Sequence, residues 1–229
     1  VLAATDLSGT RVLITGVGGF LGSTLARAAL AAGAAVHGAE FPHRLDATRR
    51  ILDAVQADGV RLWGSDLTDV GAVATLLAAT APAFVVHAAG TLGRGGGPAP
   101  WSDCVRGNVL PLAALIEAAA SLPDAARPAI LSLGSQLEYG PAATAQQETS
   151  PCRPVGAYAV SKLCGTRLLQ GAVRSETVHG VTLRLPVVFG PCQRPTLLLP
   201  DAIHHGLRGV PFAVRTPTAR RQFVSSHTV

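Results

Sequence analysis

The residues of this chain best suited to chemistry are Tyr158 and Lys162, its only lysine, four positions apart in the segment AYAVSK. The chain has 19 lysines and arginines in total, and all except Lys162 are arginine. A general need for positive charge therefore does not explain this lysine. A helix is predicted over 155–175, and side chains at i and i+4 share one helix face. A neighbouring ammonium stabilises a phenolate and lowers the tyrosine pKa from about 10. Ser135, at the end of a predicted strand, could bind the reacting oxygen.

A glycine-rich turn, TGVGGFLG, stands between a predicted strand over 11–15 and a predicted helix over 20–33. Such a turn lets the backbone approach a pyrophosphate, and the helix N-terminus then presents N–H groups to it. Glu40 ends the next predicted strand, where its carboxylate would accept hydrogen bonds from an adenosine ribose. The predicted binding residues of the turn are Gly16, Gly19, Phe20, Leu21 and Gly22.

Predicted strands and helices alternate along the whole chain, which is typical of a parallel sheet covered on both faces. Strands are predicted over 11–15, 34–40, 60–67, 83–90, 129–135 and 180–190. Helices are predicted over 20–33, 46–57, 69–80, 101–121, 155–175 and 197–208. A flexible loop is predicted over 93–100, in the segment GRGGGPAP.

These segments, in this order, resemble the extended branch of the short-chain dehydrogenase/reductase superfamily, the NAD-dependent epimerase/dehydratase family. The resemblance rests on TGVGGFLG, SDLTD, HAAG, RGNVLPLAALIEAA, GSQLEYG with AYAVSK, and LRLPVVFGP. It implies an α/β fold with a Rossmann-like doubly wound parallel sheet and a partly missing, small C-terminal substrate lobe. Residues 1–190 would be the NAD(P)-binding domain and 191–229 the start of the substrate-binding lobe. It also implies a homodimer.

The resemblance implies roles for further residues. Asp66 and Leu67 would flank the adenine. The segment Ala88, Ala89 and Gly90 would pass along the cofactor, and Pro186 and Val188 would lie beside the nicotinamide. Asn108, in the long helix near the active site, would be a catalytic residue together with Ser135, Tyr158 and Lys162. Tyr158 and Lys162 would also contact the cofactor. The compact lysine ammonium suits contacts with both the tyrosine and the ribose hydroxyls.

The reaction class follows from a departure within this family. Dehydratases of nucleotide sugars carry an Asp-Glu pair after the catalytic serine or threonine, whereas this chain has Gln136 and Leu137. We therefore expect an epimerase or a 4-keto reductase of a nucleotide sugar. The alternative is a dehydrogenase of a small hydroxy acid or sugar acid. A cofactor sensor without activity would lack the tyrosine-lysine pair. NAD is expected over NADP because Glu40 would repel a 2′-phosphate, although Arg44 could bind one.

Composition excludes several other classes. The net charge of +5 comes from scattered arginines and only 4% of residues are aromatic, so nucleic-acid binding is not expected. No apolar stretch is long enough for a membrane span, despite a mean hydropathy of +0.35. The cysteines form no CxxC pair, which predicts no metal site and small buried cysteines in a reducing cytoplasm. They are Cys104, Cys152, Cys164 and Cys192.

Overall fold

The computed structural model describes residues 6–92, 100–142, 144–214 and 220–227. Its centre is a six-stranded parallel sheet with the strand order β3-β2-β1-β4-β5-β6, which confirms the predicted doubly wound fold. The strands are β1 Arg11–Thr15, β2 Ala35–Glu40, β3 Arg61–Gly64, β4 Phe84–His87, β5 Ala129–Ser135 and β6 His179–Leu185. Of the predicted loop over 93–100, residues 93–99 lie outside the described residues.

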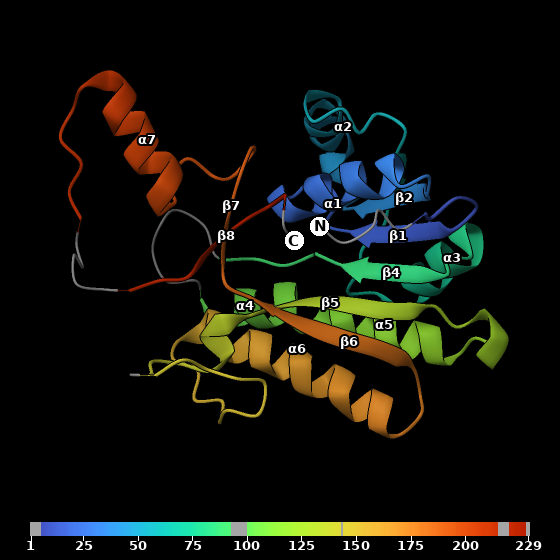
Figure 1. Ribbon diagram of the computed structural model, residues 1–229. Coiled ribbons are helices and arrows are strands. Elements are labelled where there is room, and N and C mark those ends of the chain that lie inside the picture. The colour runs from blue at the N-terminus through green and yellow to red at the C-terminus, as the bar shows by residue number, and fades with distance from the viewer. Residues whose placement is uncertain (1–5, 93–99, 143, 215–219, 228–229) are drawn as a thin grey trace.

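Helices cover both faces of this sheet (Figure 1). On one face α1 and α2 pack on β1 and β2 through a core that includes Val12, Val36 and Leu52. On the other face α3, α5 and α6 enclose a larger core that includes Leu13 and Val85. The helices are α1 Phe20–Ala31, α2 Leu45–Ala54, α3 Val70–Thr80, α4 Trp101–Asn108, α5 Leu110–Ala120 and α6 Ala157–Arg174, with short 3₁₀ turns η1 Pro42–Arg44, η2 Asp124–Ala126 and η3 Gln136–Glu138.

The helix predicted over 101–121 is wrong as one element, because it divides into α4 and α5 at Val109 (φ −106°, ψ −55°). Pro111 lacks the N–H that would continue the helical ladder, but proline is tolerated in the first turn of a new helix. The strand predicted over 180–190 is also wrong as one element. It divides at Pro186 into β6 and a separate strand β7, Val187–Phe189.

The segment after β6 leaves the main sheet. Strand β7 pairs with β8, Phe223–Ser225, in a two-stranded sheet of its own. Between them lies α7, Leu198–Arg208, which has no buried residue and stands apart from the helices of the main sheet (Figure 1). Strands β3 and β4 end at Gly64 and His87, three residues earlier than predicted, so the residues that follow them are free to form loops at the edge of the sheet.

The turn between β1 and α1 has almost no space for side chains. Gly16 has a φ of +66°, and a Cβ there would lie 2.6 Å from the Cα of Ala89. A Cβ on Gly22 would overlap the carbonyl oxygen of Gly16. Glycine at position 16 therefore lets the turn approach the backbone after β4, and glycine at position 22 lets α1 pack directly on the turn.

We expect Gly22→Ala to lower the free energy of unfolding by about 1–3 kcal/mol, because the added methyl group overlaps the Gly16 carbonyl. Gly171→Ala is the matched control, since Gly171 lies in α6 with no atom near its Cβ position. That change should stabilise the protein by about 0.5–1 kcal/mol through helix propensity. Urea denaturation measures both, and equal effects of the two substitutions would contradict this account of the turn.

Candidate active site

The main cavity, of about 750 Å³, lies where the strand order reverses between β1 and β4. Loops that leave the carboxyl ends of these strands run to opposite sides, which opens a crevice. Seven of its lining residues were predicted from the sequence: Gly16, Gly19, Glu40, Leu67, Ala88, Ala89 and Gly90. Others were not predicted as binding residues: Phe41, His43, Thr91, Asp103, Arg106, Gly107, Pro111 and Arg194, with Arg44 considered only as a phosphate ligand.

Glu40 is buried at the end of β2, with 4% of its surface exposed. Its Oε1 accepts hydrogen bonds from the Phe41 amide and from Arg44 Nη1, both at 3.2 Å. Its Oε2 is buried and has no hydrogen-bond partner among the described residues. A buried carboxylate oxygen without a donor is costly, so this atom suits a ligand that brings hydroxyl groups into the cavity.

The N-terminus of α1 borders the same cavity at Gly19, its N-cap residue. No side chain caps this end, and its first turn holds no acidic residue. The positive end of the helix dipole is therefore not neutralised by the helix's own side chains. An uncapped N-terminus preceded by a glycine turn suits a phosphate group.

The three residues predicted to act together, Ser135, Tyr158 and Lys162, lie near the cavity wall at Gly90. Tyr158 lies close enough to Ser135 for the serine side chain to lower the pKa of the phenol. Lys162 Nζ donates a 2.8 Å hydrogen bond to the carbonyl oxygen of Leu133 in β5. A Cβ built on Gly90 would lie 3.4 Å from this Nζ, so the ammonium adjoins the cavity at the point where Gly90 lines it.

The predicted lowering of the Tyr158 pKa is wrong for the protein without ligand. Burial raises the pKa of Tyr158 to about 12, the hydrogen bond with Ser135 lowers it, and the charge of Glu138 raises it further. Burial also lowers the pKa of Lys162 to about 8, although Glu138 opposes that shift. The ammonium is directed to the Leu133 carbonyl, and desolvation of the phenol therefore decides the sign.

Asn108, near the end of α4, holds backbone and helix together. Its side-chain Oδ1 accepts the Thr91 amide at 2.7 Å, and its Nδ2 donates to the Thr91 carbonyl at 3.0 Å. The same Nδ2 donates to Ser161 Oγ in α6 at 2.9 Å. The Asn108 amide thus fixes the cavity-lining segment after β4 against the helix that carries Tyr158, and a catalytic role for Asn108 stays a prediction.

Eight predicted cofactor residues are described but do not line this cavity: Phe20, Leu21, Gly22, Asp66, Tyr158, Lys162, Pro186 and Val188. Asp66 is exposed, and its Oδ1 accepts hydrogen bonds from Thr68 N at 2.9 Å and Thr68 Oγ1 at 2.7 Å. These bonds lower the pKa of Asp66 and shape the turn that leads into α3. Val188 lies in β7, outside the main sheet. Their contacts with a cofactor stay predictions.

Glu138 is a residue that the sequence analysis missed. It is fully buried, and its Oε1 accepts the Ser135 amide at 2.8 Å. Its Oε2 accepts Thr166 Oγ1 and Arg184 Nε, each at 2.8 Å. Removing one partner of a buried ion pair typically costs about 3–5 kcal/mol, because the other charge stays buried. The signal was present in the sequence, since Ser135-x-x-Glu138 is a capping-box pattern, and η3 shows both of its hydrogen bonds.

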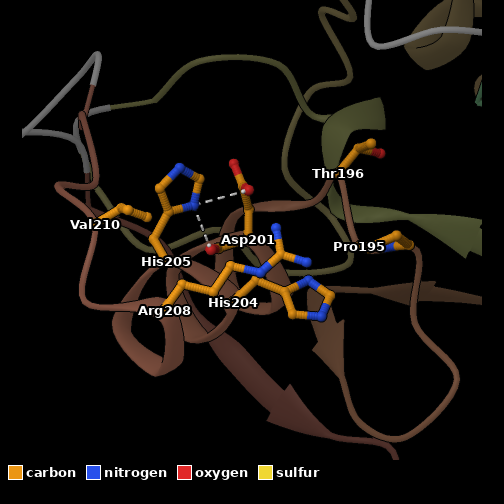
Figure 2. A pocket seen from close by; sticks show the side chains of 7 residues that line it. All are labelled: Pro195, Thr196, Asp201, His204, His205, Arg208 and Val210. Atoms are coloured by element: carbon orange, nitrogen blue, oxygen red, sulfur yellow. Dashed lines mark hydrogen bonds and ion pairs between the residues drawn. The ribbon is translucent and has the colours of Figure 1, made fainter.

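A smaller cavity, of about 300 Å³, lies against α7 (Figure 2). His205 Nδ1 lies 2.9 Å from the carbonyl oxygen of Asp201 and 3.2 Å from its Oδ1, and Figure 2 shows both interactions. The cavity is lined by Pro195, Thr196, Asp201, His204, His205, Arg208 and Val210, none of which was predicted as a site residue.

Three further observations concern membrane spans, metal ligands and cysteines. Among the described helices none is long and apolar enough to cross a membrane. In the described part of the chain no group of His, Cys, Asp or Glu could hold a metal ion. The prediction of buried cysteines holds for Cys104 alone, since Cys152 is partly buried and Cys164 and Cys192 are exposed. Cys164 lies on α6, which buries only one face, and Cys192 follows β7 in an exposed turn.

The fold and this grouping of serine, tyrosine and lysine beside a glycine-lined crevice define a member of the short-chain dehydrogenase/reductase superfamily. The chain belongs to the NAD dependent epimerase/dehydratase family, whose family model matches residues 12–227. No curated protein matches the sequence.

Solved structures with this fold include enzymes of different reactions. UDP-glucose 4-epimerase of Thermus thermophilus in complex with NAD is 26% identical (TM-score 0.78), and the match covers 95% of this chain and 71% of that one. UDP-glucuronic acid 4-epimerase of Bacillus cereus, with UDP-glucuronic acid and NAD, is 23% identical (TM-score 0.81; 95% and 70% covered). dTDP-glucose 4,6-dehydratase of Bacillus anthracis, with NAD, is 16% identical (TM-score 0.82; 96% and 68% covered). The latter two establish similarity of fold alone.

The lowered Lys162 pKa predicts a pH dependence of stability. The folded protein releases this proton at about pH 8, whereas the unfolded chain keeps it to about 10.5. Between these values the unfolded chain binds more protons, so raising the pH stabilises the wild type relative to Lys162→Met. Urea denaturation of both proteins from pH 7 to pH 9.5 measures the difference, below the range in which Tyr158 titrates. A difference that does not change with pH would contradict the buried ammonium.

Proposed function

We propose that the chain carries the cofactor-binding and catalytic part of an NAD-dependent enzyme that moves a hydride at a sugar carbon of a nucleotide sugar. The reaction would be an epimerisation or a 4-keto reduction. The observation that carries this proposal is the placement of Tyr158 and Lys162 on one face of α6, with Ser135 near the phenol and Lys162 Nζ next to the cavity wall at Gly90. Family membership and the 26% identical NAD-bound UDP-glucose 4-epimerase support the substrate class.

The residues of the main cavity fit a dinucleotide. Glu40 Oε2, which has no partner among the described residues, would accept hydrogen bonds from an adenosine ribose. The uncapped N-terminus of α1 at Gly19 would hold the pyrophosphate. Because Gly16 has no side chain, the backbone of the turn could approach the pyrophosphate closely. When bound, the nicotinamide would supply the hydride acceptor and donor.

The proton steps belong to Tyr158 and Ser135. With its pKa raised to about 12 by burial, Tyr158 is protonated at neutral pH, so it would act as a proton donor. Ser135 would hold the substrate oxygen at hydrogen-bonding distance from the phenol. Lys162 would favour the phenolate once its ammonium turns from the Leu133 carbonyl toward the cavity.

Dehydration is not part of the proposal. Gln136 and Leu137 offer no carboxyl group where dehydratases of the family carry one, and elimination of water requires an acid and a base besides the hydride step. The nearest carboxyl group in the sequence, that of Glu138, is fully buried and bonded to Arg184, Thr166 and the Ser135 amide. It cannot reach a substrate.

The domain division and the oligomeric state are part of the same proposal. We assign residues 1–190 to the cofactor domain and 191–229 to the start of the substrate lobe, which the departure of β7 from the main sheet supports. We also assign the chain to a cytoplasmic homodimer. Exposed apolar side chains on the packed helices α4 and α6 support the dimer, namely Trp101, Val105 and Leu168.

We expect the protein to bind NADH more tightly than NADPH, because the Glu40 carboxylate would repel a 2′-phosphate. Fluorescence titration of both cofactors measures this, and Glu40→Gln should narrow the difference by removing the charge. Arg44→Ala is the control, because Arg44 pairs with Glu40 at 3.2 Å and is the side chain nearest in sequence that could bind a 2′-phosphate. Binding of NADPH at least tenfold more tightly than NADH would overturn the assignment.

The function is tested by incubating the full-length protein with UDP-sugars and dTDP-sugars in the presence of NAD, and with their 4-keto forms in the presence of NADH. An epimerase converts one sugar to its isomer with no net change in NADH, and a reductase consumes NADH with a 4-keto sugar. Tyr158→Phe should lower turnover about 10²- to 10⁴-fold, because it removes the proton-transfer group. It should leave cofactor affinity nearly unchanged.

Two results would contradict the proposal. A Tyr158→Phe variant that keeps more than a tenth of wild-type activity would remove the phenol from the proton transfer. Turnover of a free hydroxy acid or sugar acid, with none of any nucleotide sugar, would favour the alternative dehydrogenase.

A further inference from the structure

The Glu138 carboxylate links the two elements that carry the proton-transfer residues. Its Oε1 accepts the backbone amide of Ser135, at the end of β5. Its Oε2 accepts the hydroxyl of Thr166, in α6. Thr166 follows Tyr158 and Lys162 at the next four-residue step, so all three side chains share one face of that helix. One carboxylate thus ties the backbone of Ser135 to the helix face that carries the phenol and the ammonium.

Neighbouring side chains and a glycine fix the position of the Glu138 carboxylate. Arg184, in β6, donates its Nε to Oε2 and its Nη1 to the Tyr139 hydroxyl at 2.9 Å. The guanidinium also lies over the Tyr139 ring, 4.7 Å from its centroid. A Cβ on Gly134 would lie 2.6 Å from Glu138 Oε1, so a glycine before Ser135 leaves the space that this oxygen occupies.

We propose that Glu138 is a positioning residue, which fixes the Ser135 backbone against α6 so that the Ser135 hydroxyl meets the Tyr158 phenol. The reaction it serves is the one under Proposed function, on which this inference rests. Glu138 itself is fully buried and touches neither substrate nor cofactor. Its carboxylate acts through the Ser135 amide on one side and Thr166 on the other.

The same carboxylate sets the charge around the phenol. Its charge raises the pKa of Tyr158 and that of Lys162, both in α6. Arg184 faces it from β6, and Cys104 faces the phenol from α4. Cys152 and Tyr139 raise the pKa of Arg184 together with Glu138. Removal of the carboxylate charge therefore shifts the Tyr158 titration to lower pH, which a merely structural residue would not do.

The test compares Glu138→Gln with Thr166→Val. A glutamine keeps the volume of the side chain, but its NH₂ group can only donate hydrogen bonds. Placed toward either the Ser135 amide or Arg184 Nε, the NH₂ group faces another donor, so one of these two hydrogen bonds is lost. We expect kcat to fall about 10- to 100-fold through misplacement of Ser135, with KM and cofactor Kd changed less than about 3-fold. Thr166→Val removes only the link to α6 and keeps the charge, so kcat should fall while the Tyr158 titration stays near that of the wild type.

The titration is read as tyrosinate absorbance after rapid pH jumps, which avoid alkaline unfolding. The chain has two tyrosines, so subtraction of the Tyr158→Phe signal isolates Tyr158. In Glu138→Gln its midpoint should lie below that of the wild type. Asp124→Asn is the control, because it makes the same change in an ion pair whose carboxylate is 89% exposed, and neither kcat nor the titration should change.

Wild-type kcat in both variants would overturn the proposal, and so would an unshifted Tyr158 midpoint in Glu138→Gln. If Glu138→Gln does not fold, Thr166→Val decides, since it keeps the Glu138–Arg184 pair, and a wild-type kcat there would equally overturn it. The absorbance titration needs neither substrate nor cofactor. A wild type without turnover of nucleotide sugars would therefore contradict the proposed function alone, whereas an unshifted Tyr158 midpoint would contradict the role of Glu138.

Discussion

The pairing of β1 with β4 on one side and β2 on the other is the constraint on which the site depends. The chain turns to one side after β1 and to the other after β4, so a crevice opens between their carboxyl ends. The backbones at Gly16 and Ala89 meet at its base so closely that no side chain fits at position 16. The cavity, the uncapped end of α1 and the segment that reaches Gly90 all follow from that approach.

Three ionisable groups lie together beside this crevice, where Glu138 is fully buried and Tyr158 and Lys162 are partly buried, and each is stabilised in a different way. Lys162 donates to a backbone carbonyl, Glu138 pairs with Arg184, and Tyr158 stays protonated. Burying charged groups is unfavourable unless they are paired and hydrogen-bonded. Holding these groups away from water lowers the stability of the folded protein and shifts their pKa values. Such shifted pKa values are typical of catalytic sites.

The part of the chain around the central sheet has a large core, whereas the part from β7 onward does not. The glycine turn, Glu40 and the tyrosine-lysine helix all lie on elements that pack on the central sheet. The segment from β7 onward forms a small sheet and a helix without buried residues, so far fewer apolar contacts hold it. In the proposed function the first group holds the cofactor and moves protons, while the second begins the lobe that selects the sugar.

The sequence by itself determined the fold class, the glycine turn and the placement of Tyr158 and Lys162 on one helix face. These features are local, because they depend on alternating strands and helices, on a turn that only glycine fits, and on the spacing of four residues in a helix. Pro111 and Pro186 were visible in the sequence, but whether a proline ends an element or only bends it depends on the packing around it.

Only the tertiary structure decided the electrostatics of the site. The sign of the Tyr158 pKa shift depends on how much water the phenol loses, and that depends on β5, α4 and α6 packing together. Glu138 could be recognised locally as part of a capping box, but its role depends on Thr166 and Arg184, which lie 28 and 46 residues away in the sequence. Burial and long-range contacts set these properties, and neither is encoded in the spacing of a short motif.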